Sequence, residues 1–393
     1  MARERFEASA GLSDEAYQEQ ILPHVSRTFA LTIPQLPSGL RRAVTNAYLL
    51  CRIADTIEDE PVLTPQQTHA FLQRFAAVVS GREPAEPLAG EVEARLSERT
   101  LPAERDLVCH MAAVIRITHA LSRDQQAAIQ RCIDLMCYGM HDFQRTASLR
   151  GLERSSDLDS YCYYVAGVVG EMLTELFCSH SAGAAQRRAA LRELAPSFAQ
   201  GLQMTNILKD MWEDRSRGAC WLPREVFARH GIDLEKLQPE PYNEKFGTAL
   251  TELIGVAHAH LRNAIAFTLL IPPEEPGIRL FCLWSVGLAV LTLRKIQHNP
   301  RFSSGADVKV SHAQVALTRL ATRWAVRHDR ALLALFDWAA GDLPLAAPAE
   351  VRRRSRAATI AAPAPEAVMD YRRNLLQPEL GGAPYPPDRS SAP

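Results

Sequence analysis

Apolar residues recur along this chain at the spacing of an α-helix, whereas the alternation of apolar and polar residues that is typical of a β-strand is nearly absent. Breaks rich in proline, glycine or serine interrupt the helical pattern at residues 34–39, 81–90, 148–157, 179–184, 239–242 and 272–277. The segments between these breaks have the length of helices. We therefore predict one all-α domain, a helix bundle whose functional site is built from inward-facing side chains.

Charge and cysteine content exclude several classes of protein. The formal net charge is −1, so we expect no nucleic-acid partner. The eight cysteines are scattered, without a CxxC pair or a Cys/His spacing suited to zinc. Cys51, Cys162 and Cys282 fall inside apolar helical runs, where we expect small buried hydrophobic residues in a reducing compartment and no disulfides.

Membrane-directing segments are not evident. The N-terminal residues carry both charge signs and no apolar run, so they do not resemble a signal peptide. The longest uncharged apolar stretch, residues 280–293, is too short to span a bilayer and predicts a buried core helix. We expect a cytoplasmic monomer, either soluble or in peripheral contact with the inner membrane surface.

The composition changes near residue 341. Nine of the 25 prolines follow that point, together with alanine-rich sequence and the basic cluster at residues 352–356. We predict a domain over residues 1–340 and a flexible Pro/Ala/Arg-rich tail over residues 341–393, with one short helix near residues 366–376. Such a tail either contacts anionic lipid headgroups or is solvated and without function, and the second alternative is favoured.

Two aspartate-rich segments lie far apart in the sequence, at residues 55–59 and 206–214, and each belongs to a predicted helix. Asp55 and Asp59 stack one turn apart on one helix face, and so do Asn206, Asp210 and Asp214. Like charges at this spacing destabilise an isolated helix. A favourable interaction must therefore offset the repulsion.

The simplest explanation of one such cluster is a solvated acidic face with basic partners nearby. Here Tyr48 and Arg52 precede the first cluster, and Lys209, Arg215 and Arg217 surround the second. Carboxylates mixed with cationic groups in apolar helices are costly to bury unless they bind a metal or an anion. Carboxylate ligands without Cys or His favour Mg²⁺, which typically bridges carboxylates and phosphate oxygens.

Four sequence blocks resemble, in order, those of the squalene/phytoene synthases, which join two isoprenyl diphosphates head to head. The blocks are SRTF at residues 26–29, YLLCRIADTIED at 48–59, YCYYVAGVVG at 161–170 and QMTNILKDMWED at 203–214. The resemblance extends over most of residues 22–339. It implies a single-domain isoprenoid-synthase helix bundle with a central active-site cavity.

The resemblance implies that Mg²⁺ on the two acidic faces neutralises a departing diphosphate. The candidate ligands are Asp55, Glu58, Asp59, Asn206, Asp210 and Asp214. Glu58 and Glu213 point about 100° away from these faces, where each is either a ligand or an outer partner, for example an ion pair to Arg52 or Arg217.

Phosphate oxygens without a metal need hydrogen-bond donors. The candidates are Ser26, Arg27, Thr28, Arg52, Lys209 and Arg217, and the alternative for each basic residue is a surface ion pair.

The condensation also removes a proton from one substrate. The resemblance places Tyr161, Tyr48, Arg52 and Gln203 at polar active-site positions. Tyr161 is our candidate for orienting or removing the proton. Alternatively, the released diphosphate is the base and the tyrosine rings stabilise cations.

Three features favour the squalene synthase branch, in which two farnesyl diphosphates form presqualene diphosphate and then squalene with Mg²⁺ and NADPH. Tyr164 stands where phytoene synthases usually carry Arg, a further helical region follows, and Lys309 lies in a segment similar to one near the cofactor phosphate. Against it, Ser311 and His312 replace a usual Arg-Lys pair, residues 217–223 are close to the phytoene synthase form, and no Rossmann glycine turn exists.

The alternatives are a phytoene or dehydrosqualene synthase without hydride transfer, a terpene cyclase that acts on one diphosphate, and a non-catalytic helical scaffold. The sequence does not distinguish a C15 from a C20 substrate, because the depth of the pocket depends on residues that only the structure identifies. It also leaves open how the final cation is quenched.

Overall fold

The computed structural model describes residues 12–26 and 28–361, and it confirms the all-α prediction, because this part of the chain contains helices and no strand. In chain order the elements are α1 (Asp14–Val25), α2 (Phe29–Thr32), η1 (Ile33–Gln35), α3 (Ser38–Glu58), α4 (Pro65–Val79), α5 (Ala85–Glu93), α6 (Pro102–Cys109), α7 (Met111–His119), α8 (Arg123–Thr146), α9 (Ser155–Cys162), η2 (Tyr163–Gly167), α10 (Val168–His180), α11 (Ala182–Gln186), α12 (Arg188–Ser216), α13 (Arg224–Arg229), η3 (Leu234–Lys236), α14 (Glu244–Leu270), α15 (Pro276–His298), α16 (His312–Ala325), α17 (Asp329–Ala340) and α18 (Pro348–Ala361).

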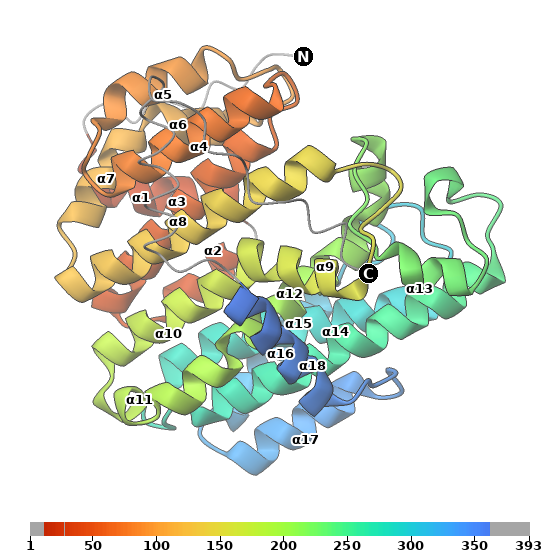
Figure 1. Ribbon diagram of the computed structural model, residues 1–393. Coiled ribbons are helices and arrows are strands. Elements are labelled where there is room, and N and C mark those ends of the chain that lie inside the picture. Colours follow the sequence, from red (N-terminus) through yellow and green to blue (C-terminus); the bar gives the residue numbers. More distant parts are fainter. Residues whose placement is uncertain (1–11, 27, 362–393) are drawn as a thin grey trace.

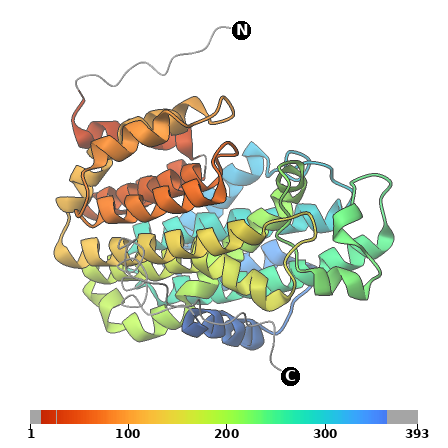
Figure 2. The same ribbon diagram turned by 45° about the horizontal axis from the view of Figure 1, so that its top comes forward.

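The long helices form two groups that meet at α8 and α10. Helices α3 and α4 pack on α8, and α10 connects α8 to α12, which runs along α14 (Figure 1). Helix α15 then packs on α12 and α14. Figure 2 shows the helices α1 to α7, in red and orange, above the layer of α8 to α15. One continuous cluster of buried apolar side chains runs through both groups.

Both acidic segments lie at the C-terminal ends of their helices. Asp55 is in the last turn of α3 and Asp59 is its C-cap, while Asp210 and Asp214 lie in the last two turns of α12. Helix α12 ends before Gly218, whose φ of +89° is one that side chains disfavour. The carbonyl end of a helix carries partial negative charge. The fold therefore places acidic side chains where they are least favourable without a cation.

Helices α14 and α15 are long and apolar enough to cross a membrane by length and composition. However, 78% and 67% of their most apolar windows are buried inside the fold, as in core helices. The prediction of a buried core helix over residues 280–293 is thus confirmed by α15. None of the eight cysteines, all of which lie within the described residues, forms a disulfide, and all but Cys109 are buried.

The first part of the predicted flexible tail is folded, which corrects the expectation for residues 341–361. Leu343 and Val351 are buried, and α18 packs on α9, α12 and α14. The basic cluster takes part in this packing, because Arg354 donates to Asp159 at 2.7 Å. Composition suggested a tail because α18 contributes few apolar side chains, and its polar contacts to the bundle were not visible in the sequence. The short helix expected near residues 366–376 lies outside the described residues.

Candidate active site

The first acidic face is held by a chain of polar contacts along α3. The Tyr48 hydroxyl donates to the Val25 carbonyl at 2.9 Å and accepts from the Arg52 guanidinium at 3.2 Å. Arg52 Nη1 then lies 3.9 Å from an Asp55 oxygen and 3.6 Å from a Glu104 oxygen. These contacts fix the guanidinium beside the carboxylate, at the spacing that the sequence predicted.

The second acidic face carries its own cations. Arg217 donates to Asp214 at 2.6 Å, and the Lys209 ammonium lies 3.0 Å from Asp210. A loop that follows α15 covers part of this face, because the Gly305 N–H donates to Glu213 at 2.8 Å. A side chain at Gly305 would meet Asp210, with its Cβ only 2.8 Å from an Asp210 oxygen. Glu213 thus bonds the loop backbone and not Arg217, contrary to one of our expectations.

The two faces are brought together across the bundle. The positive charge of Arg217 favours the ionised form of Asp59 on α3 as well as that of Asp210 and Asp214 on α12. Tyr161 lies between the same groups. Burial raises the pKa of its phenol well above the usual value, and the charges of Glu58, Asp214 and Asp59 raise it further.

Burial raises the pKa of Asp55 and of Asp214 to about 6, although Arg52 and Arg217 respectively oppose the shift. Burial also raises the pKa of Asp59 and of Asp210. Asp59 is nevertheless exposed to solvent, so the surrounding protein atoms weaken its hydration without enclosing it. Basic side chains therefore do not fully compensate the acidic charge, and a further cation would stabilise the ionised site.

The donors fit Mg²⁺ in kind, since they are carboxylate oxygens with the Asn206 amide oxygen nearby. Across the described residues, no group of three or more His, Cys, Asp or Glu side chains converges closely enough to hold a metal ion alone. Arg52 and Arg217 lie between the carboxylates. A cation at this site would therefore need oxygen ligands from elsewhere, such as phosphate or water.

An aromatic wall adjoins the polar groups. Tyr161 stacks on Trp221 with ring centroids 4.1 Å apart and planes within 8°. On the other side, Phe29 lies 5.1 Å from the Tyr48 ring and 6.3 Å from the Phe281 ring. The structure thus combines two acidic helix ends with an apolar lining.

The remaining predicted site residues are less closely tied to this arrangement. Ser26 accepts a hydrogen bond from the Phe29 N–H at 3.0 Å, and Thr28 is exposed beside it. Gln203 is half-buried on α12, and Asn206 is exposed one turn before Asp210. Lys309 is exposed on the loop that contains Gly305. Arg27 lies outside the described residues.

Three residues near the site were not predicted from the sequence. Glu104 on α6 forms an ion pair with Arg52, the Trp221 ring stacks on Tyr161, and the Gly305 N–H donates to the Glu213 carboxylate. Glu104 and Gly305 carry no local motif, because their positions follow from how distant helices and loops pack. Trp221 lies in residues 217–223, a stretch used above only to distinguish branches of the family.

An all-α bundle in which two acidic helix ends meet beside an aromatic wall is the architecture of the isoprenoid synthases. Residues 22–314 match the squalene/phytoene synthase family model, and the chain belongs to this family.

Curated relatives include the squalene synthase of Eremothecium gossypii, 28% identical over 72% of this chain and 62% of that protein. A squalene synthase of Candida albicans is 29% identical over 73% of this chain and 62% of its own length. The chain thus spans about three-fifths of the length of these relatives. The fold of a TcSQS–ligand complex matches with a TM-score of 0.70 at 23% identity, over 91% of this chain and 99% of that chain.

Proposed function

We propose that the protein is a squalene synthase that joins two molecules of farnesyl diphosphate through presqualene diphosphate, with Mg²⁺ and NADPH. The observation that carries this proposal is the meeting of the acidic ends of α3 and α12 around Arg217 and Tyr161. The names of the curated relatives support the reaction.

The diphosphate would lie between the two acidic faces. Asp55, Asp59, Asp210 and Asp214 would hold Mg²⁺, which supplies electrophilic assistance to the departing diphosphate. Arg52, Lys209 and Arg217 are the donors placed to bind phosphate oxygens, with Ser26, Arg27 and Thr28 as further candidates. Since Arg52 and Arg217 now pair with carboxylates, substrate binding would exchange these partners for phosphate.

The polar tyrosines differ in what they can do. Tyr48 donates its proton to the Val25 carbonyl and accepts from Arg52, so it positions that guanidinium. The raised pKa of Tyr161 keeps its phenol neutral, which disfavours a phenolate base. We therefore favour the alternative in which the released diphosphate takes the proton, while the Tyr161 and Trp221 rings stabilise cationic character.

The NADPH assignment rests on Lys309. Its loop is anchored to the second acidic face through Gly305, and four residues extend at most about 14 Å, so Lys309 is near the diphosphate region. Hydride from NADPH would quench the final cation. A phytoene or dehydrosqualene synthase is the alternative, and it would form its product without the nucleotide.

We also propose that the enzyme works as a cytoplasmic monomer. None of its eight cysteines forms a disulfide, and seven of them are buried, which suits a reducing compartment.

The test is incubation of the full-length chain with farnesyl diphosphate, Mg²⁺ and NADPH, followed by mass spectrometry and diphosphate quantification. We expect a C30 hydrocarbon with two diphosphates released per product. A cyclised C15 hydrocarbon would identify a terpene cyclase, and absence of diphosphate release would indicate a non-catalytic helical scaffold. A C40 product formed only from geranylgeranyl diphosphate would identify a phytoene synthase.

A further inference from the structure

Large apolar side chains that face solvent gather on the hairpin of α16 and α17. Leu317, Leu320, Trp324, Leu333 and Trp338 define what we name the hairpin face. Trp324 and Trp338 are 78% and 68% exposed. Elsewhere in the described chain the exposed large apolar residues are dispersed, at Leu12, Val62, Leu101 and Leu345. A concentration of this kind marks an interaction surface.

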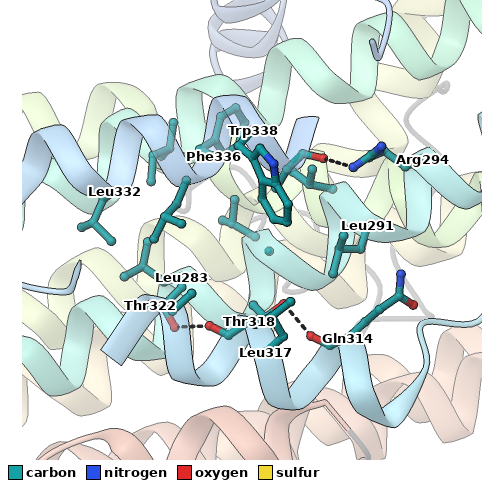
Figure 3. Close-up of a pocket in the computed structure, with 17 residues that line it drawn as sticks. Leu283, Leu291, Arg294, Gln314, Leu317, Thr318, Thr322, Leu332, Phe336 and Trp338 are labelled. Carbon is teal, nitrogen blue, oxygen red and sulfur yellow. Dashed lines mark hydrogen bonds between the residues drawn. The ribbon is translucent and has the colours of Figure 1, made fainter. Parts of the chain in front are cut away.

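An apolar groove adjoins this face (Figure 3). It lies between α15, α16 and α17, has a volume of about 240 Å³, and is lined by side chains such as Leu283, Phe336 and Trp338. Its polar side chains are already engaged. Thr318 donates to the Gln314 carbonyl at 2.8 Å, and Arg294 donates to the Ala339 carbonyl at 3.3 Å. The groove is therefore suited to hydrocarbon and not to a polar ligand.

The charge around the hairpin face is positive. Residues 308–328 contain no Asp or Glu, but they contain Lys309, Arg319, Arg323 and Arg327. The two acidic residues of α17 form ion pairs with arginines of the bundle. Asp329 pairs with the fully buried Arg279 at 2.7 Å, and Asp337 pairs with Arg262 of α14. An apolar face rimmed by arginine complements an anionic surface.

The basic cluster at residues 352–356 is a weaker candidate for lipid contact. Arg354 is engaged by Asp159 on α9, and Arg352 lies 3.8 Å from Glu193 on α12. These pairs reduce the charge that the cluster can offer to a membrane. The hairpin packs on α15 instead. Arg319 and Arg323 lie over the Trp284 ring, whereas Arg327, Arg330 and both tryptophans of the hairpin are exposed.

We propose that the α16–α17 hairpin docks on an anionic lipid bilayer. Trp324, Leu320 and Leu317 insert at the boundary between headgroups and acyl chains, where tryptophan is favoured. Arg327 and the exposed Arg330 contact the headgroup phosphates. Hydrocarbon leaving the protein in this orientation would enter the bilayer directly, but the docking itself does not depend on the reaction.

The experiment uses the full-length chain and vesicles of phosphatidylcholine with or without phosphatidylglycerol. We expect flotation with the anionic vesicles, weaker flotation with neutral ones, and release at high salt, since salt screens the arginines. Brominated lipids should quench tryptophan fluorescence in the wild type, and the double variant Trp324→Phe/Trp338→Phe should lose most of this quenching.

Two further variants separate apolar insertion from charge. Leu320→Ser/Trp324→Ser and Arg327→Glu/Arg330→Glu should each lower vesicle affinity by about tenfold or more. Their controls, Leu101→Ser and Arg99→Glu, change exposed residues between α5 and α6, outside the hairpin, and should bind like the wild type. Because all these residues are exposed, far-UV circular dichroism and the Tm should be unchanged.

Three results would overturn the proposal. They are absence of vesicle binding by the intact chain, binding that the hairpin variants leave unaltered, and a dimer in light scattering that the Leu320→Ser/Trp324→Ser variant dissociates. The last result would show that a second copy of the chain covers the face.

Discussion

Asp55 and Asp214 carry their charge where the folded protein disfavours it. Burial raises the pKa of each to about 6, and each lies in the C-terminal turns of a helix, next to partially negative carbonyls. The ionised form of each side chain therefore does not stabilise the fold. Their placement is instead that of groups selected to bind a cation, at the expense of stability.

Replacing Asp214 by Asn tests this interpretation. The Asp214 side chain is only 14% exposed, and its raised pKa means that the folded state binds more protons than the unfolded state between about pH 4 and 6. Stability therefore falls as the pH rises through this window. At pH 7.5 without Mg²⁺, Asp214→Asn should raise the free energy of unfolding by about 1–3 kcal/mol while abolishing diphosphate release.

Denaturant unfolding at two pH values provides the measurement. The advantage of the variant should vanish near pH 3, below both the unfolded pKa of 3.8 and the folded pKa of about 6, where Asp214 is largely protonated in both states. Asp124→Asn, an exposed carboxylate at the start of α8, is the matched control and should keep full turnover. A large loss of stability in Asp214→Asn with turnover retained would assign Asp214 a structural role.

For His260 on α14 we predict the opposite dependence of folding stability on pH. Burial lowers its pKa to about 3, and the nearby Arg354 charge adds to the shift. Its Nδ1 lies 2.8 Å from the Ser197 hydroxyl. Below pH 6.5 the imidazole is protonated in the unfolded chain but stays neutral in the folded protein. The free energy of unfolding therefore falls on acidification.

Between pH 6 and 4.5 the wild type should lose about 1.4 kcal/mol per pH unit relative to His260→Asn, in which the amide replaces the Nδ1 contact and does not titrate. Unfolding curves of both proteins at matched pH would measure this slope. If the free energies of unfolding of the two proteins changed with pH in parallel, His260 would be protonated in the folded state as well.

Close packing of α10 on α12 explains Gly170 in the 161–170 block. A Cβ on Gly170 of α10 would lie 2.2 Å from the Ala195 carbonyl oxygen of α12, which is part of the backbone and cannot move away cheaply. This contact indicates that α10 and α12 approach each other closely at Gly170. Gly167 is different, since its neighbour is the ring of Tyr163 within the π-helical turn η2.

Gly170→Ala should therefore destabilise the fold by about 1–3 kcal/mol through overpacking. Gly90→Ala is the matched control, since Gly90 also lies inside a helix but has nothing within 4 Å of its Cβ. That change should stabilise the protein by about 0.5–1 kcal/mol. Thermal melts of the two variants would decide, and a neutral Gly170→Ala would mean that α10 and α12 are less tightly packed than described.

At the scale of the whole molecule, the sequence predicted the helical class and the two acidic faces because both depend on local periodicity. The stacking of Asp55 on Asp59 follows from the geometry of one helix. The meeting of Asp59 with Arg217, in contrast, depends on how α3 and α12 are held by α8 and α10. Only the resemblance to the squalene/phytoene synthases made that meeting an expectation.

Other features could not be predicted, since they arise from contacts between distant segments. Nothing local marks Glu104 as a partner of Arg52, or Gly305 as a cap on Glu213. The error at residues 341–361 has the same origin. Low apolar content suggested a tail, but Arg354 and the buried Ser355 attach α18 through polar contacts to Asp159 and Gln200.

The most direct measurement of the central claim is the product formed from farnesyl diphosphate and Mg²⁺ with and without NADPH. The first condensation needs only the two acidic faces, whereas hydride enters at the last cation. We predict squalene when NADPH is present. Without it, farnesyl diphosphate should still be consumed, and presqualene diphosphate or a dehydrogenated or hydroxylated C30 product should accumulate. The same product at the same rate in both reactions would contradict the account and identify a dehydrosqualene or phytoene synthase.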